Sequence, residues 1–208
     1  PLVDAGVIPI LLGGDHSITL PELRAISRKH GPVALVQFDS HTDTYDEYFG
    51  RPHNHGTPFS RAAEEQLLDG NHSIQVRMRQ SVYARDDYEN AKSYGFDLIS
   101  MAEVREIGIP KVIERIHKRV GESRVFITFD IDAVDPAFAP GTGTPEVGGF
   151  TSEEAMRLVR GLNGLNIVGF DIVEVLPEYD PTDITALLAA NIVYQFISII
   201  AAKNKRGT

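Results

Sequence analysis

The sequence of 208 residues contains no cysteine, and this absence excludes several kinds of site. Disulfides, zinc–thiolate centres and a thiol nucleophile are all ruled out. The lack of disulfides fits a reducing compartment, and we expect a cytoplasmic protein. We find no apolar run that reaches the roughly 18 residues of a membrane span. The opening residues 1–4 do not resemble a signal peptide, and because they lack an initiator Met we expect the chain to be the later part of a longer protein.

Basic residues are outnumbered: 20 Lys and Arg stand against 29 Asp and Glu, for a net charge of −9. Such a chain repels nucleic acid and anionic membranes, so we expect neither as a partner, whereas a small cation would be attracted. The composition, 42% apolar and 24% charged, is that of an ordinary soluble globular protein. Because we find no linker and no internal repeat, we predict a single domain over residues 1–208.

Apolar runs alternate with amphipathic stretches along the whole chain. We expect strands at residues 7–12, 33–38, 73–78, 96–100, 124–129 and 166–173. We expect helices at residues 20–30, 57–70, 86–94, 110–120, 151–162 and 183–202. This alternation predicts an α/β protein with three α-β-α layers around a parallel sheet. Sheets of this kind bind ligands at the carboxyl ends of their strands.

Metal-capable side chains follow three of the predicted strands. Asp39, His41 and Asp43 stand at alternate positions after residues 33–38, and could point one way if the backbone stays extended. A lone Asp-x-Asp is more often an N-cap or Asx-turn pair, and a lone His near a helix start is usually structural. His16 follows the predicted strand 7–12, and Asp130 and Asp132 follow the predicted strand 124–129. Because all of these side chains are expected at one edge of the sheet, the sequence predicts one metal site formed by His16, Asp39, His41, Asp43, Asp130 and Asp132.

The charge and chemistry of this set indicate which metal it would hold. Four carboxylates carry a charge of about −4, which two dications would balance. Oxygen-rich ligation with some imidazole and no sulfur favours Mn²⁺. A water that bridges two dications loses a proton near neutral pH and becomes a nucleophile.

Four segments, taken in order, resemble the signatures of the ureohydrolase (arginase/agmatinase) family. They are residues 13–17 (GGDHS), 39–43 (DSHTD), 129–136 (FDIDAVDP) and 141–145 (GTGTP). The resemblance covers nearly the whole chain and implies an arginase-like fold, with homo-oligomers that are trimers or hexamers. Members of the family have further N-terminal residues, including a strand, so we expect the N-terminal part of the fold to be missing here.

The resemblance also implies a role for each site residue. Two Mn²⁺ per subunit would be held, one by His16, Asp39, Asp43 and Asp130, the other by Asp39, His41, Asp130 and Asp132, with Asp39 and Asp130 bridging. His55, in the polar segment 53–59, matches the proton-shuttle histidine. Glu174, in the segment 169–177, matches the glutamate that holds the substrate guanidinium, with Asp171 in support. A metal-bridging hydroxide would then hydrolyse a guanidino group.

Agmatine is the expected substrate, giving putrescine and urea. Arginases carry acidic residues in a segment that here corresponds to residues 79–83, which contain none. Hydrolysis of 4-guanidinobutanoate or 3-guanidinopropanoate, as in a guanidinobutyrase or guanidinopropionase, stays open. A carboxylate tail would need a cation such as Arg51, Arg77 or Arg79. Two positions depart from the family: Ser40 replaces the usual Ala, and Arg77 the usual Gly.

Two competing interpretations belong to other classes of protein. Single-zinc deacetylases share the arginase-like fold, but six ligands exceed what one zinc needs. A catalytically inactive, metal-binding regulatory subunit would keep the ligands without the activity. The apolar helix at residues 184–202 is expected to pack on the sheet.

Overall fold

Six parallel strands form the centre of the computed structural model, which describes residues 1–79 and 87–206 except the side chains of residues 77 and 204–206. The strands are β1 (Ile10–Leu12), β2 (Ala34–Phe38), β3 (Ile74–Met78), β4 (Asp97–Ser100), β5 (Arg124–Asp130) and β6 (Asn166–Val173). Their order in the sheet is β1-β6-β5-β2-β3-β4, and every neighbouring pair is parallel. The predicted parallel sheet is confirmed.

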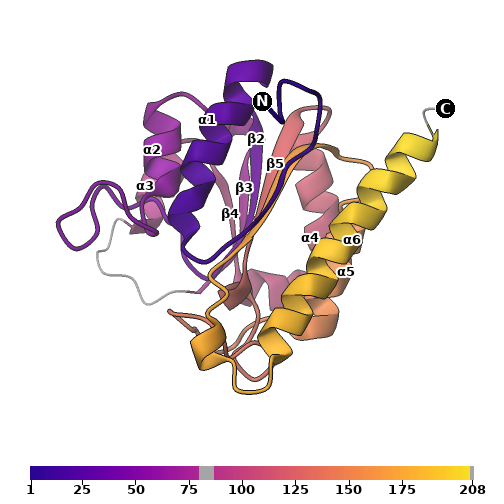
Figure 1. Ribbon diagram of the computed structural model, residues 1–208. Coiled ribbons are helices and arrows are strands. Elements are labelled where there is room, and N and C mark those ends of the chain that lie inside the picture. Colours follow the sequence, from indigo (N-terminus) through magenta and orange to yellow (C-terminus); the bar gives the residue numbers. More distant parts are fainter. Residues whose placement is uncertain (80–86, 207–208) are drawn as a thin grey trace.

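Helices cover both faces of this sheet (Figure 1). On one face lie α1 (Thr19–His30), α2 (Pro58–Glu64) and α3 (Asp87–Ser93), and on the other α4 (Met101–Val120), α5 (Ser152–Gly161) and α6 (Ile184–Arg206). Side chains of the central strands alternate between the two layers: Leu35 and Phe126 belong to one apolar cluster, Val36 and Ile127 to the other. The three-layer α-β-α architecture is therefore as predicted.

Three element boundaries differ from the sequence-based expectation. The first strand is only three residues long. Helix α2 ends at Glu64, because Gln66 adopts a φ of 57° that no helix accommodates. Gly70 does not end that helix; a Cβ at Gly70 would lie 1.8 Å from the carbonyl oxygen of Tyr94, so close backbone approach requires glycine there. Helix α4 begins before the predicted segment and is interrupted at Gly108, whose φ is 78°.

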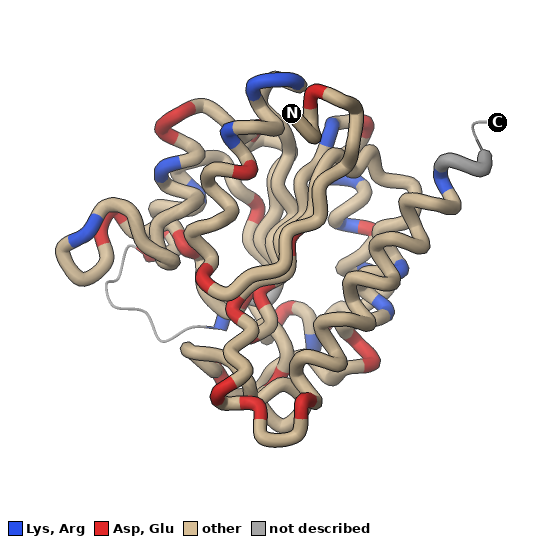
Figure 2. Tube along the Cα trace, in the orientation of Figure 1, with Lys and Arg blue, Asp and Glu red and all other residues tan. Residues whose placement is uncertain are grey.

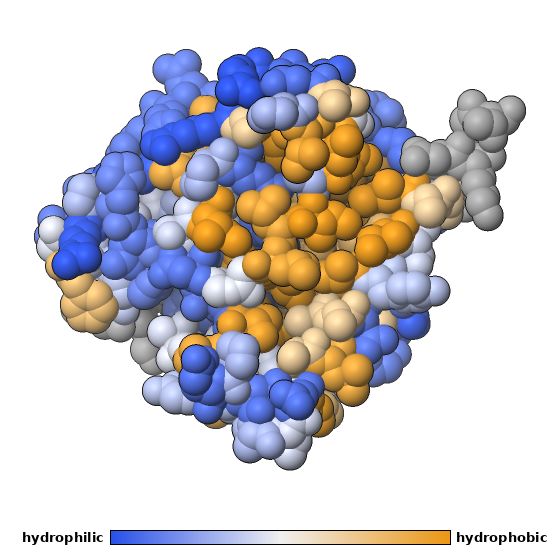
Figure 3. Space-filling view, in the orientation of Figure 1, coloured by the Kyte–Doolittle hydropathy of each residue, from blue (hydrophilic) through white to orange (hydrophobic). Residues whose placement is uncertain are grey.

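Helix α6 contradicts the statement that no apolar stretch is long enough to span a membrane. Residues 184–203 form a helix that passes this test by length and composition, with 33% of the apolar window buried. One side packs on the sheet as expected, since Phe196 stacks on Phe170 with ring centroids 3.6 Å apart and Ile192 is buried. Leu187 and Ile197 remain exposed, and Figure 3 shows an apolar surface on the side of the molecule where this helix lies. This helix is thus partly a core helix and partly apolar surface.

Helix α1 carries a buried carboxyl group that has no hydrogen-bond partner among the described residues. Glu22 is 6% exposed, and both of its carboxyl oxygens are buried and unpaired. Burial, reinforced by the nearby charge of Asp171, raises the pKa of Glu22 to about 9. The unfolded chain releases this proton at a much lower pH than the folded one. Stability is therefore lost progressively as pH rises from the ordinary glutamate pKa toward 9.

Glu22→Gln, which stays neutral at every pH, is expected to gain stability relative to the parent protein as pH rises. Each pH unit between the two pKa values of Glu22 is worth about 1.4 kcal/mol, so the advantage should grow by about 3 kcal/mol between pH 4.5 and 7. Urea denaturation across this range measures it. Glu122→Gln, an exposed site, should show no such trend. If the free energy of unfolding of Glu22→Gln differed from that of the parent protein by the same amount at every pH, packing and not ionisation would account for the difference.

Candidate metal centre

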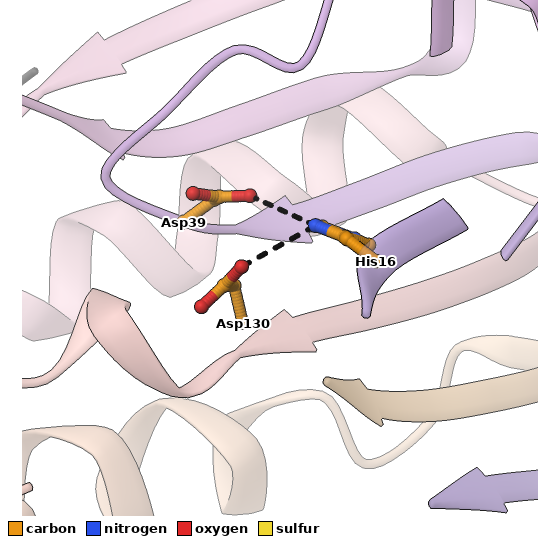
Figure 4. Close-up of side chains that lie close together, drawn as sticks. All are labelled: His16, Asp39 and Asp130. Carbon is orange, nitrogen blue, oxygen red and sulfur yellow. Dashed lines mark ion pairs between the residues drawn. The ribbon is translucent and has the colours of Figure 1, made fainter. Parts of the chain in front are cut away.

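The six predicted ligands come together at the carboxyl edge of the central strands. His16 follows β1 at the start of a short 3₁₀ segment (His16–Ile18), Asp39 follows β2, and Asp130 ends β5. The Nδ1 atom of His16 lies 2.9 Å from Asp43 Oδ2, 3.3 Å from Asp130 Oδ2 and 3.4 Å from Asp39 Oδ2. Figure 4 shows the carboxylates of Asp39 and Asp130 pointing toward the His16 ring from two strands.

A second group lies beside the first and shares one residue with it. His41 Nδ1 is 3.0 Å from Asp132 Oδ2 and 3.5 Å from Asp39 Oδ1. The ligand atoms of His16, Asp39 and Asp130 form one triad, and those of Asp39, His41 and Asp132 another, each within 4.8 Å of one another. Asp39 thus offers one oxygen to each triad. Asp130 falls in the first of these groups among the described residues, and the bridging role that the resemblance implies for it stays a prediction.

The backbone reaches this arrangement by bending. Strand β2 ends at Phe38, residues 39–43 lie outside any strand, and Asp43 has a φ of 51°. Asp39 Oδ1 accepts the backbone N–H of His41 at 2.6 Å, as in an Asx turn, and Gln37 Nε2 donates to Asp39 Oδ2 at 2.7 Å. The backbone thus leaves the extended conformation at Asp43, and the three side chains still converge.

The segment after β5 has a similar local structure. Asp130 Oδ1 accepts the backbone N–H of Asp132 at 2.8 Å, so the Asx-turn interpretation of this pair also describes it. The turn leaves Asp130 Oδ2 facing His16 and Asp132 Oδ2 facing His41. Asp130 and Asp132 thus form an Asx turn and still direct their Oδ2 atoms at the two histidines.

Electrostatics in the centre favour a cation. Burial raises the pKa of Asp39 to about 7, and the charges of Asp43 and Asp132 add to this effect. Burial opposes the charging of the imidazoles, yet the carboxylates around them raise the pKa of His41 to about 12 and that of His16 well above its usual range. These groups hold protons that a bound cation would have to displace.

The donor set fits a hard or borderline divalent cation, since it combines carboxylates and imidazoles without sulfur. His16 Nδ1 is buried and lies within 3.4 Å of three carboxylate oxygens, so a cation that displaced the ring proton would meet four ligand atoms there. A nitrogen lone pair aimed at such a point is what a metal ligand requires. The residues present therefore fit a metal site.

A pocket of about 300 Å³ opens onto this centre. Its described lining includes the acidic residues Asp43, Asp130, Glu146 and Glu174, but no Lys or Arg. Figure 2 shows acidic residues gathered at this end of the sheet, where the loops leave the strands. An acidic pocket of this size suits a small cation.

Glu174 lies directly after β6, in the left-handed region with a φ of 61°. Its Oε1 atom accepts the backbone N–H of His16 at 2.6 Å, and its own backbone N–H donates to the carbonyl oxygen of Gly14 at 2.7 Å. Burial raises the pKa of Glu174, while the neighbouring His16 opposes the rise. These contacts fix the carboxylate in the pocket wall beside the first triad.

His55 lies across the same pocket, on the loop between β2 and α2. Its Nδ1 atom is 3.6 Å from Asp15 Oδ2, and its ring meets Tyr48 edge-on with centroids 5.2 Å apart. His53, two residues earlier, is exposed and lies outside this pocket. The two residues predicted to act on a substrate, His55 and Glu174, thus line one pocket.

Arg79 has a structural role that sequence reasoning missed. Its guanidinium donates to the carbonyl oxygens of Asp132 at 2.8 Å and Val147 at 3.0 Å, and also to that of Glu146. These bonds join two loops and compete with any role as partner of a substrate carboxylate. No local signal predicts them, since the partners are 53 to 68 residues away. The Arg77 side chain and residues 80–83, also considered above, lie outside the described part of the chain.

Ser40, one of the two departures from the family pattern, touches the second triad. Its buried hydroxyl donates to Asp132 Oδ1 at 2.7 Å and lies 3.1 Å from His41 Nδ1. The backbone N–H of Ser40 donates to the same carboxylate oxygen at 3.0 Å. Ser40 therefore holds Asp132 with its other oxygen facing His41.

Comparisons with known proteins are consistent with this geometry. A model of the arginase family matches residues 1–198. Guanidinopropionase of Pseudomonas aeruginosa is 46% identical over 204 residues, which cover 98% of this chain and 64% of that protein. Agmatinase of Citrobacter koseri is 48% identical over 202 residues, covering 97% and 63% respectively.

Among solved structures, a hypothetical agmatinase from Burkholderia thailandensis is similar, with a TM-score of 0.89 at 40% identity. The match covers 98% of this chain and 62% of that one. The chain therefore spans slightly less than two thirds of the length of these relatives, and the arginase-like fold is confirmed.

Proposed function

This chain belongs to the arginase family, and from this premise we propose that the whole protein hydrolyses the guanidino group of agmatine, releasing putrescine and urea. The observation that supports it is the pocket, which has two carboxylate–imidazole triads at its base and Glu174 in its wall. Relatives named for guanidinopropionate and for agmatine are almost equally identical, so identity does not select the substrate. The acidic lining favours agmatine, because both ends of that molecule are cationic.

We propose that the two triads hold two divalent ions, and the oxygen-rich ligand set favours Mn²⁺. His16, Asp43 and Asp130 would serve one ion, His41 and Asp132 the other, and Asp39 both. Bound ions of this kind lower the pKa of a water molecule to near neutrality and so supply the nucleophile.

Glu174 would orient the substrate. A carboxylate can accept parallel N–H bonds from the planar guanidinium and fix its carbon for attack. The hydrogen bond from the His16 backbone restrains the carboxylate before substrate arrives, which lowers the entropy cost of binding. Because His16 is also a proposed ligand, this bond couples the position of the substrate to that of the metal centre.

His55 would protonate the departing amine, since imidazole titrates near neutrality and the ring lines the pocket. His55→Ala is expected to lower kcat by about 10²- to 10⁴-fold while metal content stays unchanged. His53→Ala, in an exposed neighbour outside the pocket, is the matched control and should keep full turnover. Near-full turnover in His55→Ala would show that another group supplies the proton.

Urea release from a panel of guanidino compounds tests the proposed function. The manganese-loaded full-length protein is given agmatine, arginine, 4-guanidinobutanoate and 3-guanidinopropanoate, and we expect the highest kcat/KM with agmatine. A preference for a guanidino acid would overturn agmatine but keep the class of reaction. No urea from any of the four, at full metal loading, would support the regulatory-subunit alternative.

A further inference from the structure

The far side of the His16 ring meets a buried set of polar groups that the proposed mechanism does not use. His16 Nε2 lies 2.9 Å from the hydroxyl oxygen of Thr128, and both residues are fully buried. Thr128 stands on β5 two residues before Asp130. Its partner in the parallel register with β6 is Asp171, also fully buried.

Asp171 has an acceptor available for Thr128. Its Oδ2 atom accepts the Thr19 hydroxyl from α1 at 2.6 Å, and the carboxylate also interacts with the Thr128 hydroxyl and with the backbone N–H of Phe129. Residues paired in register on adjacent strands place their side chains on the same face of the sheet. The Thr128 hydroxyl therefore lies between the His16 ring and the Asp171 carboxylate.

The chemistry of imidazole fixes the direction of these hydrogen bonds. A neutral imidazole carries one proton, so a ring whose Nδ1 binds a cation must carry that proton on Nε2. Nε2–H then donates to Thr128, and the Thr128 hydroxyl has its own hydrogen left to donate to Asp171. The opposite tautomer would place a hydrogen on Nδ1 among three carboxylate oxygens, in the position that the proposed cation would take.

We infer that Thr128 and Asp171 are positioning residues that hold His16 in the Nε2–H tautomer, with the Nδ1 lone pair directed at the first triad. The inference concerns the proposed metal site and does not depend on which guanidino compound is the substrate. The edge contact of the ring with Phe59, whose centroid is 5.3 Å away, restrains its tilt but cannot select a tautomer. With a cation at Nδ1, the contact between Nε2 and the Thr128 hydroxyl favours the Nε2–H form.

Thr128 and Thr19 both interact with the Asp171 carboxylate, but Thr128 is the one that also contacts His16. Comparing variants of the two threonines therefore separates positioning of His16 from a purely structural role. Thr128→Val removes the hydroxyl beside His16 with little change in shape. Thr19→Val removes only the hydrogen bond from Thr19 on α1 to Asp171 on β6. Binding of Mn²⁺ to the metal-stripped full-length protein is measured by calorimetry, and thermal stability is measured on the same metal-free samples. Loss of an outer partner of a ligating histidine typically weakens metal affinity by about 10- to 100-fold.

We expect Thr128→Val to lose affinity in that range for one of the ions, Thr128→Ser to recover it, and Thr19→Val to lose stability without losing affinity. Equal loss of affinity in the two valine variants, or no loss in Thr128→Val, would overturn the inference. Metal binding is read without substrate, so a failure of the urea assay would leave this result unaffected.

Discussion

Asp39→Ala is expected to abolish the binding of both divalent ions, whereas His41→Ala should weaken mainly one. Asp39 supplies an oxygen to each triad, at 3.4 Å from His16 Nδ1 and 3.5 Å from His41 Nδ1. Because loss of an outer partner alone costs about 10- to 100-fold, loss of this ligand should lower kcat/KM by more than about 100-fold. Metal analysis after equilibration with Mn²⁺ and a calorimetric isotherm measure the effect.

Two further variants make this result interpretable. Asp39→Asn keeps the shape and an acceptor for the His41 N–H, so metal loss in this variant cannot be attributed to collapse of the turn. Asp46→Ala removes a carboxylate from the adjoining loop that is 91% exposed and paired with Arg61, and should retain both ions. If His41→Ala lost both ions as completely as Asp39→Ala, the division into two triads would be incorrect.

Glu174→Gln is expected to impair substrate use while leaving metal content intact. The variant keeps an oxygen for the His16 N–H but removes the negative charge that would face the guanidinium. Loss of one partner of a buried, hydrogen-bonded charge pair costs about 2–5 kcal/mol, which corresponds to about a 30- to 4,000-fold decrease in kcat/KM. Steady-state kinetics with agmatine, alongside metal analysis, measure both quantities.

Glu178→Gln is the matched control, because it makes the same change four residues further on at an exposed site outside the pocket. We expect it to leave kcat/KM and metal content unchanged. A Glu174→Gln variant that kept its kcat/KM would remove Glu174 from the substrate site. One that lost metal would instead assign it to the metal centre through its bond to His16.

Much of the fold was predictable because its signals are local. Strand β6 and the start of α5 coincide with the predicted positions, since an apolar run and a capping box are properties of neighbouring residues. The end of α2 was not predictable, because it depends on the left-handed conformation of Gln66. The predicted role of Gly70 failed for a different reason. Its contact with Tyr94 joins segments 24 residues apart.

The metal centre also has features that neighbouring residues predict and features that depend on contacts between distant segments. The sequence by itself determined which residues could ligate a metal, because they follow strands, and the carboxyl ends of parallel strands share one edge. Only the tertiary structure decided that Asp39 lies between the two triads, that Arg79 joins two loops, and that Thr128 and Asp171 lie behind His16. These facts depend on the turn at residues 39–43 and on contacts between residues 43 to 112 positions apart. Such contacts leave no local pattern, because a hydrogen bond depends on where folding brings its two atoms and not on which residues adjoin them.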